Sequence, residues 1–172
     1  MGKQADADFL GWVSSSRDGL RKTAYLLCGD WFLADDLAQD ALTRLFGVWG
    51  RVSSAGDPAP YARKILVNLY LDHRRRPSRR EVSHAQLPDS VGVEQANSVD
   101  GDRDRLMTAL ASVPKGQRAV LVLRYWDDLS IEQTAIALGT SASNVRSQAS
   151  RGLDALREAL EPDPITAPEE AL

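Results

Sequence analysis

Apolar residues recur at intervals of three or four positions through the first part of the chain, which is the period of an amphipathic helix. A first stripe is formed by Phe9, Val13, Leu20, Ala24 and Leu27. Gly29 and Asp30 interrupt this period. A second stripe is formed by Ala34, Ala38, Leu42, Leu45 and Trp49. Glycine commonly ends a helix and aspartate commonly begins one. The pattern therefore predicts two consecutive helices.

A third helix is predicted after a break at residues 50–56. Asp57 and Pro58 form a strong helix start, because aspartate caps the first N–H groups and proline is preorganised for the first turn. The helix should run from Pro58 to about Arg76, since Pro77 cannot continue it. Its expected core stripe consists of Ala62, Ile65, Leu66, Leu69 and His73.

The helical period returns after residue 105. Leu106, Leu110 and Val113 mark one helix, and residues 117–125 form an apolar-rich second one. Together with the first three helices, they predict an all-α fold.

A helix-turn-helix is predicted next. Ser130 and Gln133 fit a capping box, in which each side chain satisfies the other residue's backbone N–H. Gly139 lies where a left-handed residue ends the helix, and Ser141 caps the helix that follows. The apolar stripe of that last helix contains Val145, Ala149, Leu153, Leu156 and Leu160. A short helix, a glycine turn and a longer helix have the geometry of a DNA-binding helix-turn-helix.

The segment between the two helical blocks has no helical period and is acidic, with prolines and glycines. We therefore expect two small helical domains joined by a flexible acidic linker, the C-terminal domain being the helix-turn-helix. The predicted boundaries are 5–80 for the first domain, 81–104 for the linker, 105–160 for the second domain and 161–172 for a disordered acidic tail.

Charge is unevenly distributed along the chain. The net charge of −3 over 172 residues argues against a uniformly basic nucleic-acid binder. However, residues 61–84 carry seven basic and two acidic side chains, whereas residues 85–104 carry one basic and five acidic ones. Five arginines lie within residues 74–80. One or two bases would suffice to stabilise a helix C-terminus, so this excess favours a surface that binds a polyanion.

The outer face of the last predicted helix is a candidate DNA-reading surface. Its first turns would enter the major groove with short, polar or basic side chains. These are Ser143, Asn144, Arg146, Ser147, Gln148 and Arg151. An ordinary amphipathic hairpin would also be polar outside. The glycine turn, the capping box and the absence of acids from this face favour DNA binding.

A second candidate surface is acidic and lies on the second predicted helix. It consists of Asp35, Asp36, Gln39 and Asp40. Neighbouring carboxylates on a helix do not converge on one point, so acid–base catalysis is not favoured. A solvated surface and a protein-binding surface both remain open from the spacing.

Several classes of function find little support. The single cysteine, Cys28, excludes an internal disulfide and a cysteine-based zinc site. His73 and His84 do not form a metal-ligand set, and the sequence contains no phosphate-binding loop. We expect no cofactor, no metal and no catalytic residue. No apolar run approaches the ~18 residues of a membrane span, so we expect a cytoplasmic protein with no membrane partner.

The motifs together resemble the bacterial sigma factors of the extracytoplasmic-function group, and within it an actinobacterial subset. The resembling segments are residues 26–30 with 34–40, 61–72 with 74–76, 113–126 and 130–157. The resemblance implies a factor that binds core RNA polymerase and directs promoter recognition, DNA melting and transcription initiation. The implied partners are the clamp helices and flap of the polymerase and promoter DNA. An anti-sigma protein is a further candidate, and the free protein is expected to be a monomer.

The resemblance also implies roles for individual residues. The acidic surface would bind the clamp helices, and the last helix would read the minus-thirty-five element. The loop at residues 52–57 would receive a flipped base, Asn68 would help to form its pocket, and Asp72 occupies a position that varies in the family. The minus-ten contacts implied in this way are Ser53, Ser54, Asp57, Arg63, Lys64, Asn68, Asp72, Arg74, Arg75 and Arg76.

The main alternative is a stand-alone helix-turn-helix regulator whose first block serves dimerisation or sensing. Such a protein would bind a palindromic site as a dimer without polymerase. A sigma factor would instead bind promoters well only together with the core enzyme.

Overall fold

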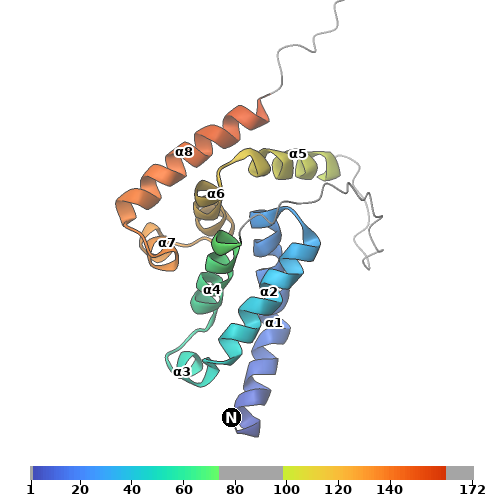
Figure 1. Cartoon of the computed structure of the whole chain (residues 1–172), viewed down its shortest axis with the longest axis vertical. Coiled ribbons are helices and arrows are strands. Elements are labelled where there is room, and N and C mark those ends of the chain that lie inside the picture. Colours follow the sequence, from blue (N-terminus) through green and yellow to red (C-terminus); the bar gives the residue numbers. More distant parts are fainter. Residues whose placement is uncertain (1, 74–98, 162–172) are drawn as a thin grey trace, which may run out of the picture.

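The structure, a computed structural model, describes residues 2–73 and 99–161. In these ranges every regular element is a helix (Figure 1). The elements are α1 (Lys3–Cys28), α2 (Trp31–Phe46), α3 (Trp49–Ser54), α4 (Ala59–Asp72), α5 (Val99–Ser112), α6 (Lys115–Leu121), the π-helical turn η1 (Val122–Trp126), α7 (Ile131–Leu138) and α8 (Ala142–Leu160). The all-α fold is confirmed. Within the described ranges no helix is long and apolar enough to cross a membrane.

The first two helices end and begin where the sequence predicts. Gly29 takes the left-handed conformation (φ 73°), which glycine adopts without steric cost, and its N–H donates to the Tyr25 carbonyl. The Asp30 carboxylate accepts hydrogen bonds from Phe32 N at 2.8 Å and Leu33 N at 3.3 Å. Two N–H groups at the start of α2 are thereby satisfied.

The predicted break at residues 50–56 is partly wrong, because it contains most of the short helix α3. Trp49 and Val52 anchor this helix in the core and are buried. After α3, the Asp57 carboxylate accepts from Ala59 N at 3.0 Å and so initiates α4, as its helix-start pattern predicts.

The third predicted helix ends earlier than the sequence predicts. The helix ends at Asp72, and His73, predicted as a core residue, is exposed at its C-terminus. Ala62 and Leu66 are buried as predicted, Ile65 and Leu69 are half-buried, and Val67 and Tyr70 complete the buried stripe. Arg76, where the helix was expected to end, lies outside the described residues.

The second helical block begins earlier than predicted. Helix α5 starts at Val99, so residues 99–104 of the predicted linker are helical. An aromatic pair of the first block supports this start. The rings of Tyr25 and Trp31 stack with centroids 3.8 Å apart, and the Arg103 guanidinium lies 5.7 Å from the Tyr25 ring centroid. A cation over aromatic faces is stabilising, which explains why a segment with little apolar period is ordered.

The helix-turn-helix has the predicted caps. Ser130 Oγ accepts from Gln133 N at 3.0 Å, and Gln133 Oε1 accepts from Ser130 N at 2.8 Å, which confirms the capping box. Gly139 is left-handed (φ 62°), and Ser141 Oγ accepts from Asn144 N at 3.1 Å. Before this motif the chain makes the π-helical turn η1, a widened turn that often occurs at functional sites.

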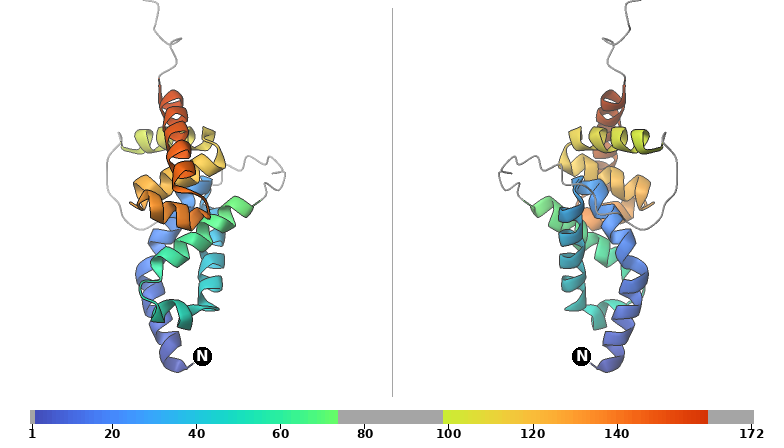
Figure 2. Two further views of the ribbon diagram at one scale, coloured as in Figure 1. Left: turned by 90° about the vertical axis from the view of Figure 1, so that its left-hand side faces the viewer. Right: turned by 90° about the vertical axis from the view of Figure 1, so that its right-hand side faces the viewer.

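The two helical blocks pack against each other, which the sequence did not predict. Figures 1 and 2 show α7 beside α4, and α5 and α6 above the upper end of α1. One apolar core combines Leu27 and Leu66 of the first block with Ala119, Leu123 and Ala137 of the second. The described parts of the two predicted domains therefore form one closed body.

Candidate nucleic-acid interface

The acidic surface on α2 is largely exposed. Asp36, Gln39 and Asp40 are open to solvent. Asp35 is half-buried, and its Oδ2 accepts from Arg21 Nη2 at 3.2 Å. Arg21 also lies over the Trp31 ring, 4.4 Å from its centroid. Asp35 thus helps to hold α2 on α1, whereas the other three side chains are available to a partner.

An exposed aromatic residue, which the sequence analysis missed, extends this surface. Phe32 is 79% exposed. It precedes Asp36 by four positions and Gln39 by seven, so the three side chains share one face of α2. Aromatic residues are enriched at protein–protein interfaces, so an exposed phenylalanine favours such a role for this face. Phe32 lies outside the apolar stripe of α2, and this position is the signal in the sequence that could have indicated its exposure.

The hydroxyls predicted to contact DNA bond to their own helix. Ser53 Oγ donates to the Trp49 carbonyl at 2.8 Å, and Ser54 Oγ donates to the Arg51 carbonyl at 3.0 Å. Both residues remain exposed on α3. Their hydroxyl oxygens still have acceptor capacity.

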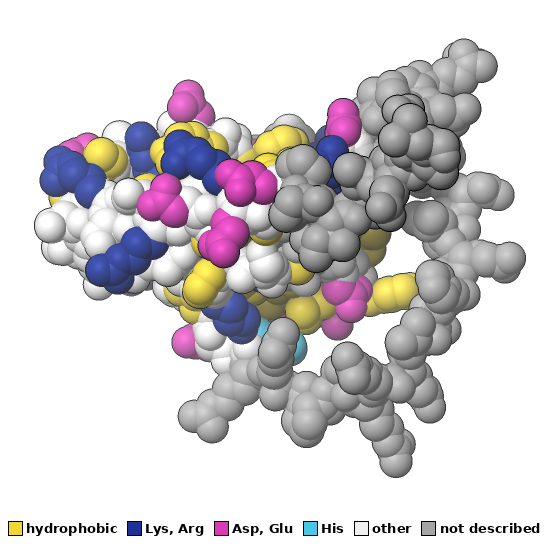
Figure 3. Space-filling view, turned by 90° about the horizontal axis from the view of Figure 1, so that it is seen from above, with side chains coloured by type: hydrophobic (Ala, Val, Ile, Leu, Met, Phe, Trp, Pro, Cys, Tyr) yellow, Lys and Arg dark blue, Asp and Glu magenta, His cyan; other side chains and the backbone are white. Residues whose placement is uncertain are grey.

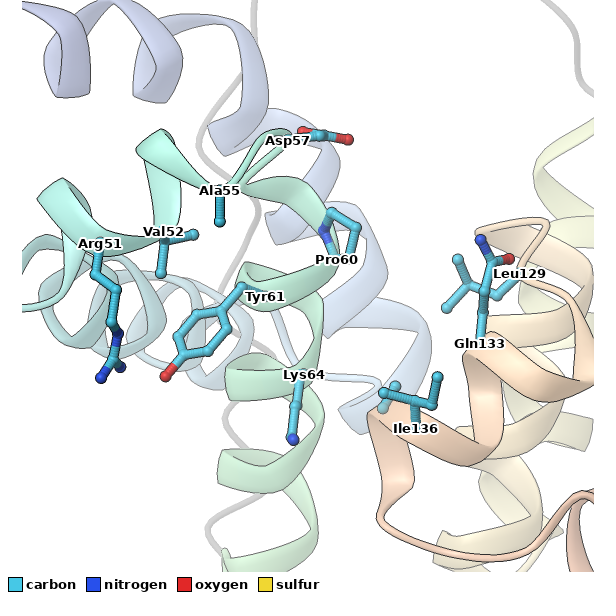
Figure 4. A pocket seen from close by; sticks show the side chains of 11 residues that line it. Arg51, Val52, Ala55, Asp57, Pro60, Tyr61, Lys64, Leu129, Gln133 and Ile136 are labelled. Atoms are coloured by element: carbon cyan, nitrogen blue, oxygen red, sulfur yellow. The ribbon is translucent and has the colours of Figure 1, made fainter.

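A cavity of about 470 Å³ opens between the α3–α4 region and the second block (Figure 4). Its lining combines Asp57, Tyr61 and Lys64 with Leu129, Gln133, Ile136, Arg51, Val52, Ala55, Pro60 and Ala137. Figure 4 shows Tyr61 and Lys64 projecting from α4 on one side, and Ile136 on the α7 side facing Lys64. The predicted base-capture loop at residues 52–57 therefore borders a space that the helix-turn-helix block partly encloses.

Arg63 lies at the contact between the two blocks and is partly buried there. Its Nε is 3.6 Å from Asp127 Oδ2, and the two side chains are 29% and 8% exposed. Asp127 Oδ1 accepts from the buried Thr23 hydroxyl at 3.0 Å. Three elements, α1, α4 and the end of η1, thus meet at one carboxylate.

The contacts of the Asp127 carboxylate only partly offset the cost of burying it. Its Oδ2 is buried and has no hydrogen-bond partner among the described residues. Burial raises the pKa of Asp127 above its ordinary value, and the Thr23 hydroxyl and Arg63 offset this rise only in part. Sequence analysis missed Thr23 and Asp127 as a pair, because a polar residue in an apolar stripe gives no indication of its partner.

Two cations of α6 bind backbone carbonyls at the C-terminal ends of first-block helices. Lys115 Nζ donates to the Tyr70 carbonyl at 3.0 Å and to the His73 carbonyl at 2.7 Å. Arg118 Nη1 donates to the Leu27 carbonyl at 2.9 Å. Helix C-termini carry partial negative charge, so cations there are stabilising. These contacts were also not predicted.

The remaining predicted minus-ten residues are dispersed along α4. Asn68 is half-buried and Asp72 is exposed. Lys64 is exposed at the cavity. Arg74, Arg75 and Arg76 lie outside the described residues.

The predicted reading face of α8 is open to solvent. Val145 is fully buried beneath it, whereas Ser143, Asn144, Arg146 and Arg151 are exposed. Ser147 and Gln148 are half-buried. Asn144 Nδ2 donates to Thr140 Oγ1 at 2.8 Å, which orients its amide at the start of the helix. Arg146 lies 3.9 Å from Glu132, but both side chains are well exposed, so this pair is weak.

The view down onto the second block shows a mixed surface. In Figure 3, basic and acidic side chains of the described residues are interspersed on this face and do not form a field of one sign. Within the described ranges, no group of three or more His, Cys, Asp or Glu residues could hold a metal ion.

Comparisons with known proteins agree with this arrangement. The family model Sigma-70 region 2 matches residues 12–80, and Sigma-70, region 4 matches residues 103–156. The RNA polymerase sigma-E factor of Streptomyces avermitilis is 37% identical over 154 residues, which cover 90% of this chain and 86% of that protein. The chain belongs to the sigma-70 family of RNA polymerase sigma factors.

Further relatives include sigma factors named as members of the extracytoplasmic-function group. The ECF RNA polymerase sigma factor SigE of Mycolicibacterium smegmatis is 32% identical over 156 residues, 86% of this chain and 60% of that protein. The sigma factor RpoE of Bartonella quintana, solved in complex with the anti-sigma factor NepR, has a TM-score of 0.70 at 24% identity. That likeness covers 91% of this chain and 98% of RpoE, and it supports the fold. The protein is a sigma factor for promoter recognition and transcription initiation, and sigma factors are in general not catalysts.

Proposed function

We propose that this sigma factor binds the clamp helices of core RNA polymerase through the acidic surface of α2. The observation that carries the proposal is the exposed face of Phe32, Asp36 and Gln39, with Asp40 beside it. An aromatic anchor supplies apolar contact area, and the carboxylates attract a basic partner helix. Asp35 contributes chiefly by holding α2 on α1 through Arg21.

The minus-ten element would be read and melted by α3, α4 and the loop between them. Capture of an unstacked base needs a pocket with cations behind it on the strand's phosphates. The loop at 52–57 with Ser53, Ser54 and Asp57, and the side chains of Asn68 and Asp72, would form the pocket side. The cations would be Arg63, Lys64, Arg74, Arg75 and Arg76.

The minus-thirty-five element would be read by α8. Its first turns are exposed, and their base-edge contacts would come from Asn144, Gln148 and Arg151. Asparagine and glutamine pair with adenine, and arginine pairs with guanine in the major groove. Ser143, Arg146 and Ser147 would contact phosphates and fix the register.

The domain boundaries follow from these roles. We assign residues 5–80 to the core- and minus-ten-binding domain, 81–104 to the linker with its last residues in α5, 105–160 to the minus-thirty-five-binding domain and 161–172 to the tail. The chain itself would carry no catalysis, and it would work in the cytoplasm, where sigma factors act with RNA polymerase. An anti-sigma protein is a candidate partner, since RpoE of Bartonella quintana was solved with one. The flap of the polymerase would bind the second domain.

Binding to purified core enzyme tests the assignment of the acidic surface. The double variant Asp36→Lys/Asp40→Lys should weaken binding by about tenfold or more, because it places like charges against a basic partner. The double variant Asp8→Lys/Asp18→Lys makes the same charge change at exposed positions of α1 and should bind core normally. Equal binding by all three proteins, measured by gel-filtration co-elution and fluorescence titration, would show that another surface binds the polymerase.

A further inference from the structure

The cavity of about 470 Å³ where the α3–α4 region meets α7 has the properties of a small-molecule site (Figure 4). Such sites usually measure about 300–1,000 Å³ and often lie between domains. Both blocks form its walls, with Val52 and Tyr61 from the first block and Leu129 and Ile136 from the second. A molecule bound here would contact both blocks at once.

The floor of this cavity is an open edge of the apolar core. Val52, Leu129 and Ala137 line the cavity, belong to the core and are buried. Ile136 also lines it, yet its side chain is 69% exposed. Covering apolar surface that water now touches is favourable, in proportion to the area removed from water. The walls therefore fit an apolar chain.

Hydrogen-bond donors mark one side of the cavity. In Figure 4 the side chains of Arg51, Tyr61 and Lys64 point to the same side, whereas the Asp57 carboxylate lies at the opposite edge. Among the described residues, neither Arg51 nor Lys64 forms an ion pair. Guanidinium, ammonium and phenol groups all donate hydrogen bonds. This side of the cavity therefore fits an anionic group.

The charges of the lining fit one negative charge better than several. Arg51 and Lys64 carry two positive charges, and Asp57 carries a negative charge at the opposite edge. A single carboxylate balances the remaining positive charge, whereas a polyphosphate would exceed it. Two forked or pivoting donors are also well suited to the two oxygens of a carboxylate.

We propose that this cavity binds a fatty-acid-like molecule, with one carboxylate and an unbranched apolar chain. The carboxylate would accept hydrogen bonds from Arg51, Tyr61 and Lys64, and the chain would lie between Leu129 and Ile136. The site would add a small-molecule ligand to the proposed function. It depends on the cavity alone and not on any role of these residues toward DNA.

Binding of this ligand would hold the two blocks together. In the closed form, the two blocks pack as in Figure 1, with α7 beside α4. A molecule that contacts walls from both blocks binds the closed form more tightly than a form in which the blocks are apart. A ligand raises the population of the state that it binds better. The concentration of the carboxylate would thereby set the fraction of closed protein.

Calorimetric titration of the full-length protein tests the ligand chemistry. Sodium salts of hexanoate, octanoate and decanoate are used below the concentrations at which they form micelles. Affinity should rise about threefold to fourfold for each added CH₂ group. Decanol has a chain of the same length without the charge, and should bind about tenfold more weakly than decanoate. Lys64→Gln should reduce this preference for decanoate, whereas Lys22→Gln, at an exposed position of α1, should retain it.

The exposed isoleucine allows a test of the location. Ile136→Glu places a carboxylate beside the apolar chain and should weaken decanoate binding by about tenfold or more. Leu10→Glu makes the same type of change at an exposed position of α1 outside the cavity and should bind decanoate normally. Circular dichroism shows whether both variants keep their helix content.

Spin labels report whether the ligand holds the blocks together. They are placed through Asp18→Cys on α1 and Ala159→Cys on α8, both exposed positions, in a Cys28→Ala background. Lys115→Ala removes a contact between the blocks and should lower the fraction at the short distance of the closed form, measured by double electron–electron resonance. Decanoate should restore this fraction, and Ile136→Glu should prevent the restoration.

Three results would overturn the inference. The first is the absence of decanoate binding, or binding that shows no preference over decanol. The second is decanoate binding that Ile136→Glu and Leu10→Glu affect equally, which would place the molecule elsewhere. The third is binding that leaves the distance between the blocks unchanged in Lys115→Ala. Failure of the proposed function is a separate result, namely no promoter-dependent transcription with core enzyme, and it leaves these measurements unaffected.

Discussion

At the scale of single residues, the carboxylate of Asp127 is the most consequential group. It lies 104 positions from Thr23 along the chain, yet the two side chains share a hydrogen bond. Nothing in the local sequence marks this pairing. Asp127 directly follows the π-helical turn η1, which precedes the helix-turn-helix. This turn places the Asp127 carboxylate against the first block.

Closure should depend on pH through Asp127. Burial raises the pKa of Asp127 in the closed form. The closed form therefore binds a proton more tightly than the open form, and closure strengthens as the pH falls. Among the described residues, Arg63 of α4 is the charged side chain that lowers the pKa of Asp127, and the Thr23 hydroxyl of α1 lowers it through a hydrogen bond.

The measurement is the closed fraction from the spin-label distances between about pH 8 and about pH 5. The unmodified protein should show more of the short distance at the acidic end. Asp127→Asn cannot titrate and should lose this dependence. Two results would contradict the assignment of the pH dependence to Asp127. One is a closed fraction that falls as the pH is lowered, and the other is a closed fraction of Asp127→Asn that still changes with pH.

At the scale of secondary-structure elements, the helix ends follow from the sequence. Caps are local interactions within four residues, as at Asp30, Ser130 and Ser141. The π-helical turn and helix α3 were not predictable in the same way, because their conformations depend on what Trp49 and Leu123 pack against. The helix start at Val99 likewise depends on aromatic rings of the first block.

The capping box should contribute measurably to stability. Ser130→Ala removes the acceptor for Gln133 N and should lower the free energy of unfolding by about 1 kcal/mol. Ser150→Ala makes the same replacement at an exposed position inside α8 and should leave stability nearly unchanged. Denaturant unfolding followed by circular dichroism measures both. Equal midpoints for the two variants would mean that the cap is not stabilising.

The sequence predicts which side chains share one face of a helix, but it does not predict which helices lie against each other. Exposed faces of single helices, such as Asn144 to Arg151 on α8, follow from periodicity alone. The relation between α4 and α7 does not, because it depends on contacts such as Arg63 with Asp127 and on one core built from distant segments. Exposure of Phe32 could have been suspected from its position outside the apolar stripe.

At the scale of the whole molecule, the two helices proposed to read DNA and the helix proposed to bind the polymerase belong to two blocks that pack together around one core. The 25 residues between the described ranges could span about 80 Å if fully extended, so chain length does not prevent opening. A factor that is closed when free and open on the polymerase would present both reading helices only in the holoenzyme. A dimeric regulator has no need of such an arrangement.

Transcription with purified core enzyme tests the central claim most directly. Genomic fragments are transcribed with and without the protein, and transcript 5′ ends are mapped. We predict starts that require both protein and core and that share two separate upstream elements. Arg151→Ala should reduce these starts through the element farther from the start site, and Asn68→Ala should reduce open complexes at the nearer one. If no transcription start depends on the protein, the account is contradicted. It is also contradicted if the protein protects a palindromic DNA site equally well with and without core enzyme.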